Sequence, residues 1–205
     1  MSLVLYYSPM SSAVTSHWAL EELGIPYEKV RLDLQAGDQN KPKFLEINPN
    51  GKVPALVHDG TAIFESVAIL IHLGETFGVD KGLFPAPGLQ RAEALKWLVW
   101  CNVSLGDALS RWQRNVSGRV AEELRNAKAG EAAKGEVESH FAILERALAG
   151  KKYLVGDRFT FADLQVAGWA SYVAMCGLDL AKYPTVAAWS KTCNERPAAK
   201  RAEAA

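Results

Sequence analysis

Two adjacent serines, Ser11 and Ser12, stand where an apolar run, LVLYY, gives way to a segment with helical character. A strand that leads directly into a helix points the first unpaired N–H groups of that helix beyond the carboxyl end of the strand. Such a place suits an anion, and a serine there commonly caps the helix. The sequence leaves open whether these hydroxyls only cap or whether one of them also contacts a reactive group.

Two further segments place polar groups next to predicted strands. In NPNGKVP, Pro54 precedes an apolar run, where it cannot donate to a ladder and where a cis bond would fix the turn. A cis Val53–Pro54 bond would leave the N–H and C=O of Val53 free to pair with an extended, peptide-like ligand. In FES, Glu65 and Ser66 begin a helix, so Ser66 faces a second anion site and Glu65 could accept an ammonium group. Taken alone, FES is better explained by a helix cap and a helix-start glutamate.

The elements that position these residues alternate in type along the first eighty residues. LVLYY and YEKVRLDL are predicted strands, and ALVH and TAIF form a predicted hairpin across Asp-Gly. SAVTSHWALEELG and ESVAILIHLGETFG have helical spacing, while NKPKFLEI is expected to form a short irregular helix. This order predicts a mixed sheet covered by helices, with a right-handed parallel crossover at its start.

The pattern changes at FPAPG, a natural linker, after which the segments have a helical period. We therefore predict two domains of different class. An α/β domain spans residues 1–80, a linker spans 81–88, and an all-α domain spans 89–205.

Composition excludes several classes of function. The formal net charge is zero, without the basic face that binding to nucleic acid or an anionic membrane requires. No apolar stretch is long enough to span a membrane, and the N-terminal run lacks the basic flank of a secretion signal. The three cysteines and four histidines are widely spaced, which gives neither a disulfide framework nor a metal-ligand pattern. We expect a cytoplasmic protein without a metal.

The serine turn, the NPNGKVPAL loop and the DGTAIFES junction, in this order, resemble the glutathione-binding domain of the cytosolic glutathione transferases. The resemblance covers essentially the whole chain, with a thioredoxin-like domain followed by a linker and an all-helical domain. FTFADLQVAGW resembles the structural signature of the family, with a capping box of Thr160 and Asp163 and an apolar staple from Phe159 to Leu164. Asp163 is thus expected to serve folding rather than catalysis.

The resemblance implies that glutathione binds as co-substrate. Val53 would pair with its cysteinyl backbone, Glu65 and Ser66 would hold its γ-glutamyl end, and Lys52 would meet its glycyl carboxylate. The full set of implied ligand residues is Lys52, Val53, Pro54, Glu65, Ser66, Asn40 and Lys41.

Catalysis would require ionisation of the glutathione thiol, because a cysteine thiol has a pKa of about 8.5 and is mostly protonated at neutral pH. Lowering that pKa by about two units requires roughly 2.7 kcal/mol of preferential stabilisation of the thiolate. One hydroxyl hydrogen bond to an anion contributes about 1.5–3 kcal/mol, and a helix N-terminus about 0.3–2 kcal/mol. A serine at the start of a helix can therefore do this without a general base.

The resemblance offers three candidates for that group. Ser11 matches the catalytic hydroxyl of the serine-type classes, two residues after the strand-ending proline, and is the first choice. Ser12 stands where the bacterial beta class has a cysteine, and Tyr7 would supply a phenol as in the tyrosine-type classes. No cysteine precedes Cys101, so beta- or omega-like mixed-disulfide chemistry lacks its nucleophile. Gly106 stands where the beta class has a histidine, so the chain is not a plain beta-class enzyme.

The second substrate, a small hydrophobic electrophile, is expected to lie against Met10 and the helix that bears Trp112 and Val116. Most members of the family are twofold homodimers, and we expect the same here. Three other reactions with glutathione stay open: peroxide reduction, isomerisation and ether cleavage. A further alternative is a catalytically idle module that binds glutathione or protein.

Overall fold

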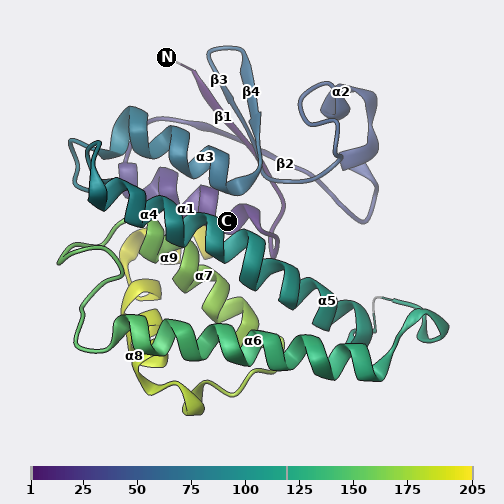
Figure 1. Cartoon of the computed structure of the whole chain (residues 1–205). Coiled ribbons are helices and arrows are strands. Elements are labelled where there is room, and N and C mark those ends of the chain that lie inside the picture. Colours follow the sequence, from purple (N-terminus) through teal and green to yellow (C-terminus); the bar gives the residue numbers. More distant parts are fainter. Residues whose placement is uncertain (1, 119, 205) are drawn as a thin grey trace. The chain divides into compact units, whose positions relative to one another are not determined.

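The computed structural model describes residues 2–118 and 120–204. They form two compact units (Figure 1). The first contains the residues up to Arg91 together with those from Asn194 onward, and the second is Ala92–Cys193. The predicted combination of an α/β part and an all-helical part is confirmed. The return of the C-terminal segment to the first unit was not predicted, and the boundaries at 80 and 89 stay predictions.

A mixed four-stranded sheet with the order β2-β1-β3-β4 forms the centre of the first unit. Strands β1 (Leu3–Tyr7) and β2 (Glu28–Arg31) are parallel, as the crossover through helix α1 (Ala13–Leu23) requires. Strands β3 (Ala55–His58) and β4 (Thr61–Phe64) form the predicted hairpin. Its turn residues, Asp59 and Gly60, both have positive φ, as a type I′ turn requires.

Helices cover both faces of this sheet. Helix α1 packs against β1 and against helix α3 (Ser66–Leu73), which ends in a π-helical turn over Gly74–Gly78. On the opposite face, Phe44 of the short helix α2 (Pro42–Leu45) packs on Tyr6, with ring centroids 5.7 Å apart. A short 3-10 turn, Asp38–Asn40, precedes α2. The predicted irregular helix is thus present in two pieces.

The C-terminal helix α9 (Pro197–Glu203) packs on α1. Arg196, just before α9, forms two hydrogen bonds of 2.6 and 2.7 Å with the carboxylate of Glu22, which also accepts from the Trp18 indole. Arg201 of α9 pairs with Glu21 at 2.5 Å. A segment remote in sequence therefore covers the helix that follows the serine turn.

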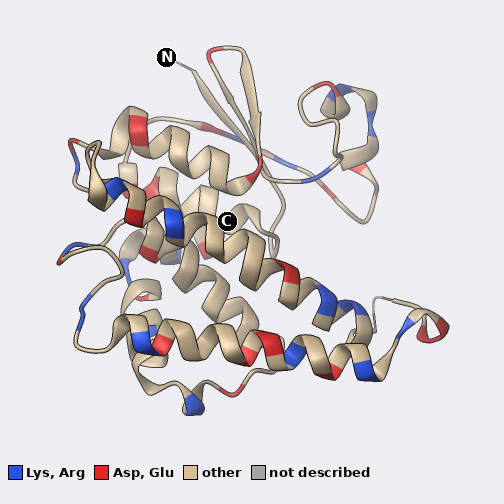
Figure 2. Cartoon of the chain, viewed as in Figure 1, with Lys and Arg blue, Asp and Glu red and all other residues tan. Residues whose placement is uncertain are grey.

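The second unit consists of helices. Residues 89–116 divide into α4 (Leu89–Trp100, which begins in the first unit), a π-helical turn over Cys101–Leu105, and α5 (Gly106–Val116). The later helices and turns are a 3-10 turn over Glu122–Leu124, α6 (Ala127–Leu148), α7 (Phe161–Met175), a 3-10 turn over Leu180–Lys182 and α8 (Pro184–Asn194). Figure 2 shows charges of both signs interspersed along α6. Within the described ranges, no helix has the length and apolar character that crossing a membrane demands.

The predicted capping box at the start of α7 is confirmed. The Asp163 carboxylate is fully buried and accepts hydrogen bonds from the Thr160 N–H and hydroxyl, the Leu154 N–H and the Trp189 indole N–H. Burial raises the pKa of Asp163, although each of these donors acts to lower it. Asp163 therefore joins the start of α7 to the preceding loop and to α8, as expected for a folding device.

Replacing Asp163 by alanine should lower the free energy of unfolding by about 3 kcal/mol, because several buried donors would lose their acceptor. Urea titration followed by circular dichroism measures this loss. Asp157→Ala, an exposed aspartate in the same loop, is the matched control and should change little. Equal unfolding midpoints for the two variants would contradict this role.

Candidate active site

The register of the sheet brings the sequence motifs to one edge. Ala55, the first residue of β3, pairs with Tyr6 of β1 on one side and with Phe64 of β4 on the other. The Val-Pro turn precedes Ala55, the FES junction follows Phe64, and the serine turn follows β1. All three segments therefore leave the sheet at the same end.

The serine turn has a strained backbone. Met10 has φ of 56°, in the left-handed region that favours glycine, and its side chain is 83 % exposed. A non-glycine residue in this region costs on the order of 1 kcal/mol. The turn places an exposed thioether next to the two serines, and the contact of Met10 with a second substrate stays a prediction.

The two serines have different hydrogen-bond partners. The Ser11 hydroxyl donates to the Ser8 carbonyl at 2.6 Å and accepts from the Ala13 N–H at 3.2 Å, so it closes the turn and caps α1. The Ser12 hydroxyl is exposed and donates to the Val53 carbonyl at 3.2 Å. Ser11, the first choice from the sequence, has its proton committed within the turn, whereas Ser12 reaches the Val-Pro loop.

The Val53–Pro54 peptide bond is cis. Among the described residues, the Val53 N–H has no hydrogen-bond partner, as expected for a group available to a ligand. The expectation that the Val53 carbonyl is also free is wrong, because it accepts from the Ser12 hydroxyl. The loop and the serine turn are thus joined directly.

A buried asparagine that the sequence analysis missed holds this loop. The Asn48 amide donates to the Lys52 carbonyl at 2.6 Å and accepts from the Asn50 N–H at 3.0 Å. Asn48 is only 2 % exposed. An asparagine that bonds to backbone two and four residues later is typical of a side-chain-stabilised turn, so the sequence NPNG contained the signal.

Glu65 and Ser66 occupy the junction between β4 and α3. Glu65 is exposed with φ of 70°, a second left-handed residue at this edge of the sheet, and its carbonyl accepts the N–H of Ile69. Ser66 is buried as the first residue of α3. The exposed Glu65 is therefore accessible to a ligand in solvent, whereas Ser66, the next residue, is buried.

The candidate residues for a carboxylate differ in their availability. Lys52 is exposed and directly precedes Val53, whereas Lys41 forms an ion pair of 2.7 Å with Asp38. Asn40 lies against the loop, since a Cβ on Gly51 would be 3.2 Å from its Oδ1. Lys52 is the cation that the loop itself carries.

Tyr7 lies on the face of the sheet covered by α1. It is 9 % exposed, and its ring is 5.7 Å from that of His17. His17 is 2.7 Å from the Tyr27 hydroxyl, which donates to Glu21. Burial lowers the pKa of His17 and raises that of Tyr27. Tyr7 thus borders a buried polar cluster, and its role as a thiol-activating phenol stays a prediction.

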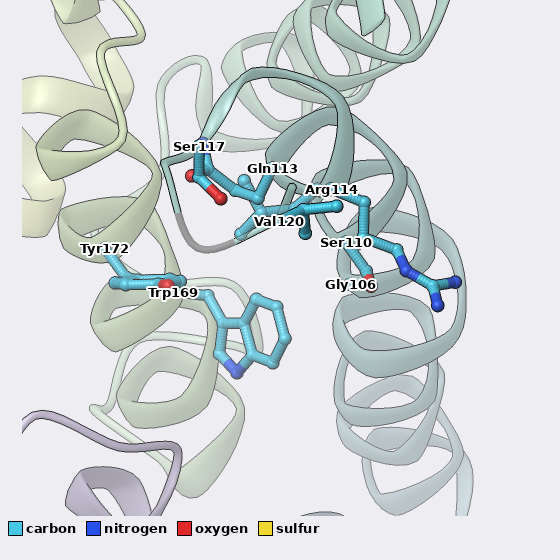
Figure 3. Close-up of a pocket in the computed structure, with 9 residues that line it drawn as sticks. Gly106, Ser110, Gln113, Arg114, Ser117, Val120, Trp169 and Tyr172 are labelled. Carbon is cyan, nitrogen blue, oxygen red and sulfur yellow. The ribbon is translucent and has the colours of Figure 1, made fainter. Parts of the chain in front are cut away.

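The second unit contains a cavity of about 300 Å³ between α5 and α7. Trp112, predicted to line a substrate pocket, is buried and is not among the residues that line this cavity, and neither is Val116. Val116 lies near α6, 3.4 Å from where a Cβ on Gly130 would stand. The cavity instead uses another face of α5, from Gly106 to Arg114 (Figure 3). The predicted contacts of Met10, Trp112 and Val116 with an electrophile stay predictions.

Comparison with known proteins identifies the family of this chain. The family model for the N-terminal domain of glutathione S-transferases matches residues 1–75, and the model for their C-terminal domain matches residues 113–197. Glutathione S-transferase GstB of Escherichia coli K12 is 33 % identical over 184 residues, which cover 89 % of this chain and 88 % of GstB. The chain belongs to the glutathione S-transferase family. Its first unit therefore has the thioredoxin-like fold that the sequence predicted.

Three other similar proteins differ in what their names say. Disulfide-bond oxidoreductase YfcG of Escherichia coli K12 is 32 % identical over 97 % of this chain and 93 % of its own length. A sphingomonad glutathione S-transferase, solved with glutathione, is 31 % identical, has a TM-score of 0.84, and is matched over 98 % of this chain and 97 % of that one. Ure2p in complex with glutathione has a TM-score of 0.90 at 26 % identity, over 100 % and 93 % of the two chains. Among the described residues, no group of three or more metal-ligating side chains is placed to hold an ion.

Replacing Asn48 by alanine should loosen the Val-Pro loop of this transferase-family chain, because the Lys52 carbonyl and the Asn50 N–H lose their partner. We expect a loss of about 1–2 kcal/mol in the free energy of unfolding and faster proteolytic cleavage within residues 49–53. Asn50→Ala, which removes only the hydrogen bond that the exposed Asn50 side chain donates to Asn48, is the control. Cleavage at the same rate in both variants would show that Asn48 does not hold the loop.

Proposed function

We propose that this protein is a glutathione transferase in which the Ser12 hydroxyl stabilises the thiolate of bound glutathione. The observation that carries the proposal is the hydrogen bond between Ser12 and the carbonyl of Val53, whose N–H has no partner among the described residues. The Val53 N–H could donate to the backbone of a peptide-like ligand, and the neighbouring Ser12 hydroxyl could donate to a sulfur anion.

Glutathione fits the charges along this edge of the sheet. Its cysteinyl backbone would accept from the Val53 N–H, its glycyl carboxylate would meet Lys52, and its γ-glutamyl ammonium would meet the exposed Glu65. Asn40, Lys41, Pro54 and Ser66 stay further proposed ligand residues. Solved relatives that contain glutathione support this choice of ligand.

Ser12 is better suited than Ser11 to stabilise the thiolate. A hydroxyl proton can rotate from the Val53 carbonyl to a nearby sulfur without movement of the backbone. Ser11 would first have to break its 2.6 Å bond to Ser8 inside a strained turn. The N-terminus of α1, eleven residues long, adds a favourable potential for the anion.

The proposed reaction begins with release of the thiol proton of glutathione to solvent. The thiolate sulfur then attacks an electrophilic carbon of a small hydrophobic substrate, which forms a C–S bond. The bond from that carbon to its leaving group breaks, and the leaving group departs with the electron pair. Ser12 acts by favouring the anion, so no side chain has to accept the proton. Such a reaction would serve the detoxification of electrophiles.

Titration of the thiolate absorbance of bound glutathione tests this assignment. Ser12→Ala should raise the apparent pKa of the bound thiol by about one to two units, because a charge-assisted hydrogen bond is lost. Ser11→Ala should shift this pKa much less and should instead lower stability by about 1 kcal/mol, as expected for loss of a helix cap.

Calorimetric binding of glutathione is the control for both serine variants. If Ser11→Ala carries the larger shift of the thiol pKa, the role returns to Ser11. If wild-type protein binds glutathione without a thiolate signal, the chain is a binding module whose serines are only caps. Absence of glutathione binding would overturn the proposed function altogether.

Thiol–disulfide exchange is a second candidate, favoured by the similarity to disulfide-bond oxidoreductase YfcG. Here the thiolate of glutathione would attack a disulfide, form a new S–S bond and release the other sulfur as a thiolate. The chain has no cysteine before Cys101, and Cys101 is fully buried, so glutathione would supply the nucleophile. Turnover of 2-hydroxyethyl disulfide, compared with that of a chloronitrobenzene, separates the two reactions.

We also propose that the protein is cytoplasmic and forms a twofold homodimer, as the family resemblance implies. Sedimentation velocity at micromolar concentration should give about twice the chain mass of 22.4 kDa. A single species at the mass of one chain would contradict the dimer.

A further inference from the structure

Two histidines from different elements of the first unit contact each other. His58 is the last residue of β3, and His72 lies in the last turn of α3. The Nδ1 atom of His58 is 2.8 Å from the Nε2 atom of His72, and the ring centroids are 5.1 Å apart. At this distance one ring nitrogen carries a proton and donates it, while the other accepts with its lone pair. The pair therefore joins the β3–β4 hairpin to α3 by a hydrogen bond.

Both histidines are largely shielded from water. The side chain of His58 is 16 % exposed and its ring is 5.7 Å from that of Phe77, while His72 is half-buried. A positive charge in such a place loses part of its hydration. Burial, and after it the charge of His58, lower the pKa of His72, whereas Glu75 acts in the opposite direction. The surroundings thus favour the neutral form of His72.

Two carboxylates and one guanidinium surround the pair. On the hairpin, Asp59 has a carboxylate oxygen 3.5 Å from the Nε2 atom of His58, and it also accepts a backbone N–H at 2.6 Å. In the π-helical turn after α3, Glu75 forms an ion pair of 3.1 Å with Arg91. Both carboxylates therefore already have another donor. They can support one positive charge on the two imidazoles, but they are poorly placed to neutralise a second.

The hydrogen bond survives the binding of one additional proton but not of two. With one, a charged imidazolium donates to a neutral imidazole, and the bond persists. With two, an N–H group on each ring would face the other across 2.8 Å, and two like charges would repel each other in a partly buried place. In the unfolded chain both histidines titrate at about pH 6.5. Below that pH the unfolded chain therefore binds more protons than the folded one.

From these features we infer that the His58–His72 pair is a pH-sensitive contact that stabilises the first unit at neutral pH and is lost on acidification. The stability that it contributes is present above about pH 6.5 and decreases as the pH falls below that value. Both histidines lie at the ends of β3 and α3 that are remote from the candidate active site, which is built where these elements begin. The inference is therefore independent of the proposed reaction.

Urea unfolding of wild-type protein and His72→Gln, followed by circular dichroism at about pH 7 and about pH 5, tests the inference. At the higher pH the variant should have the lower urea midpoint, because it lacks the histidine pair. At the lower pH the two midpoints should converge, since the folding equilibrium constant of the wild type should fall on the order of tenfold more than that of the variant. A difference between the two midpoints that is the same at both pH values would overturn the inference.

His140→Gln is the matched control, because His140 lies in α6 of the second unit. Its midpoint should differ from that of the wild type by the same amount at both pH values. The pKa of the buried His17 is lowered by burial and by Lys29, so His17 also makes the protein less stable on acidification. Because His17 is present in all these proteins, its contribution cancels in the comparison.

A nuclear magnetic resonance titration of the imidazole protons tests the pair in the folded protein, even if His72→Gln fails to fold. The His72 resonance of the wild type should titrate below about pH 6.5, and its midpoint should rise in His58→Gln, because the neighbouring positive charge is removed. An equal His72 midpoint in the wild type and in His58→Gln would show that the two rings titrate independently, and the inference would then be wrong.

Discussion

The pairing of β3 with a strand on each side is the constraint on which the candidate site depends. Because β3 is central and its first residue pairs with both β1 and β4, the chain segments before and after these strands must emerge together. A shift of register by one residue would turn Ala55 and Leu56, both fully buried, to the opposite faces. The packing of the sheet thus fixes the positions of polar groups that contribute nothing to the core.

Two residues at the junctions between the strands and the helices depart from ordinary backbone preferences. Met10 and Glu65 both have left-handed backbones, although neither residue type favours them. Such conformations persist only where the surrounding structure determines them, and they concentrate at sites of binding and catalysis. Here the two strained residues flank the beginnings of α1 and α3. The stability they cost is offset by the buried strands and helices to which they are attached.

The sequence was sufficient for the features governed by nearby residues. Alternating apolar residues, the Asp-Gly turn and the Thr160–Asp163 pair predicted the strands, the hairpin and the capping box. The sequence could not decide between Ser11 and Ser12, because the direction of each hydroxyl depends on the backbone of a strained turn. The face of α5 that lines the cavity was also missed. Trp112 is the larger residue, yet it is buried in the core, while Gly106 has no side chain and so leaves room for the indole of Trp169.

The cover of α1 by the C-terminal segment has a consequence for the order of folding. Glu22 and its partner Arg196 are separated by 174 positions in the chain. During synthesis the first unit therefore emerges without the segment that neutralises the 7 % exposed carboxylate of Glu22. The α/β unit reaches its final state only after the helical unit has been made. The sequence of the second unit lies between the two segments of the first unit. The first unit therefore cannot complete its folding before the second unit has been synthesised.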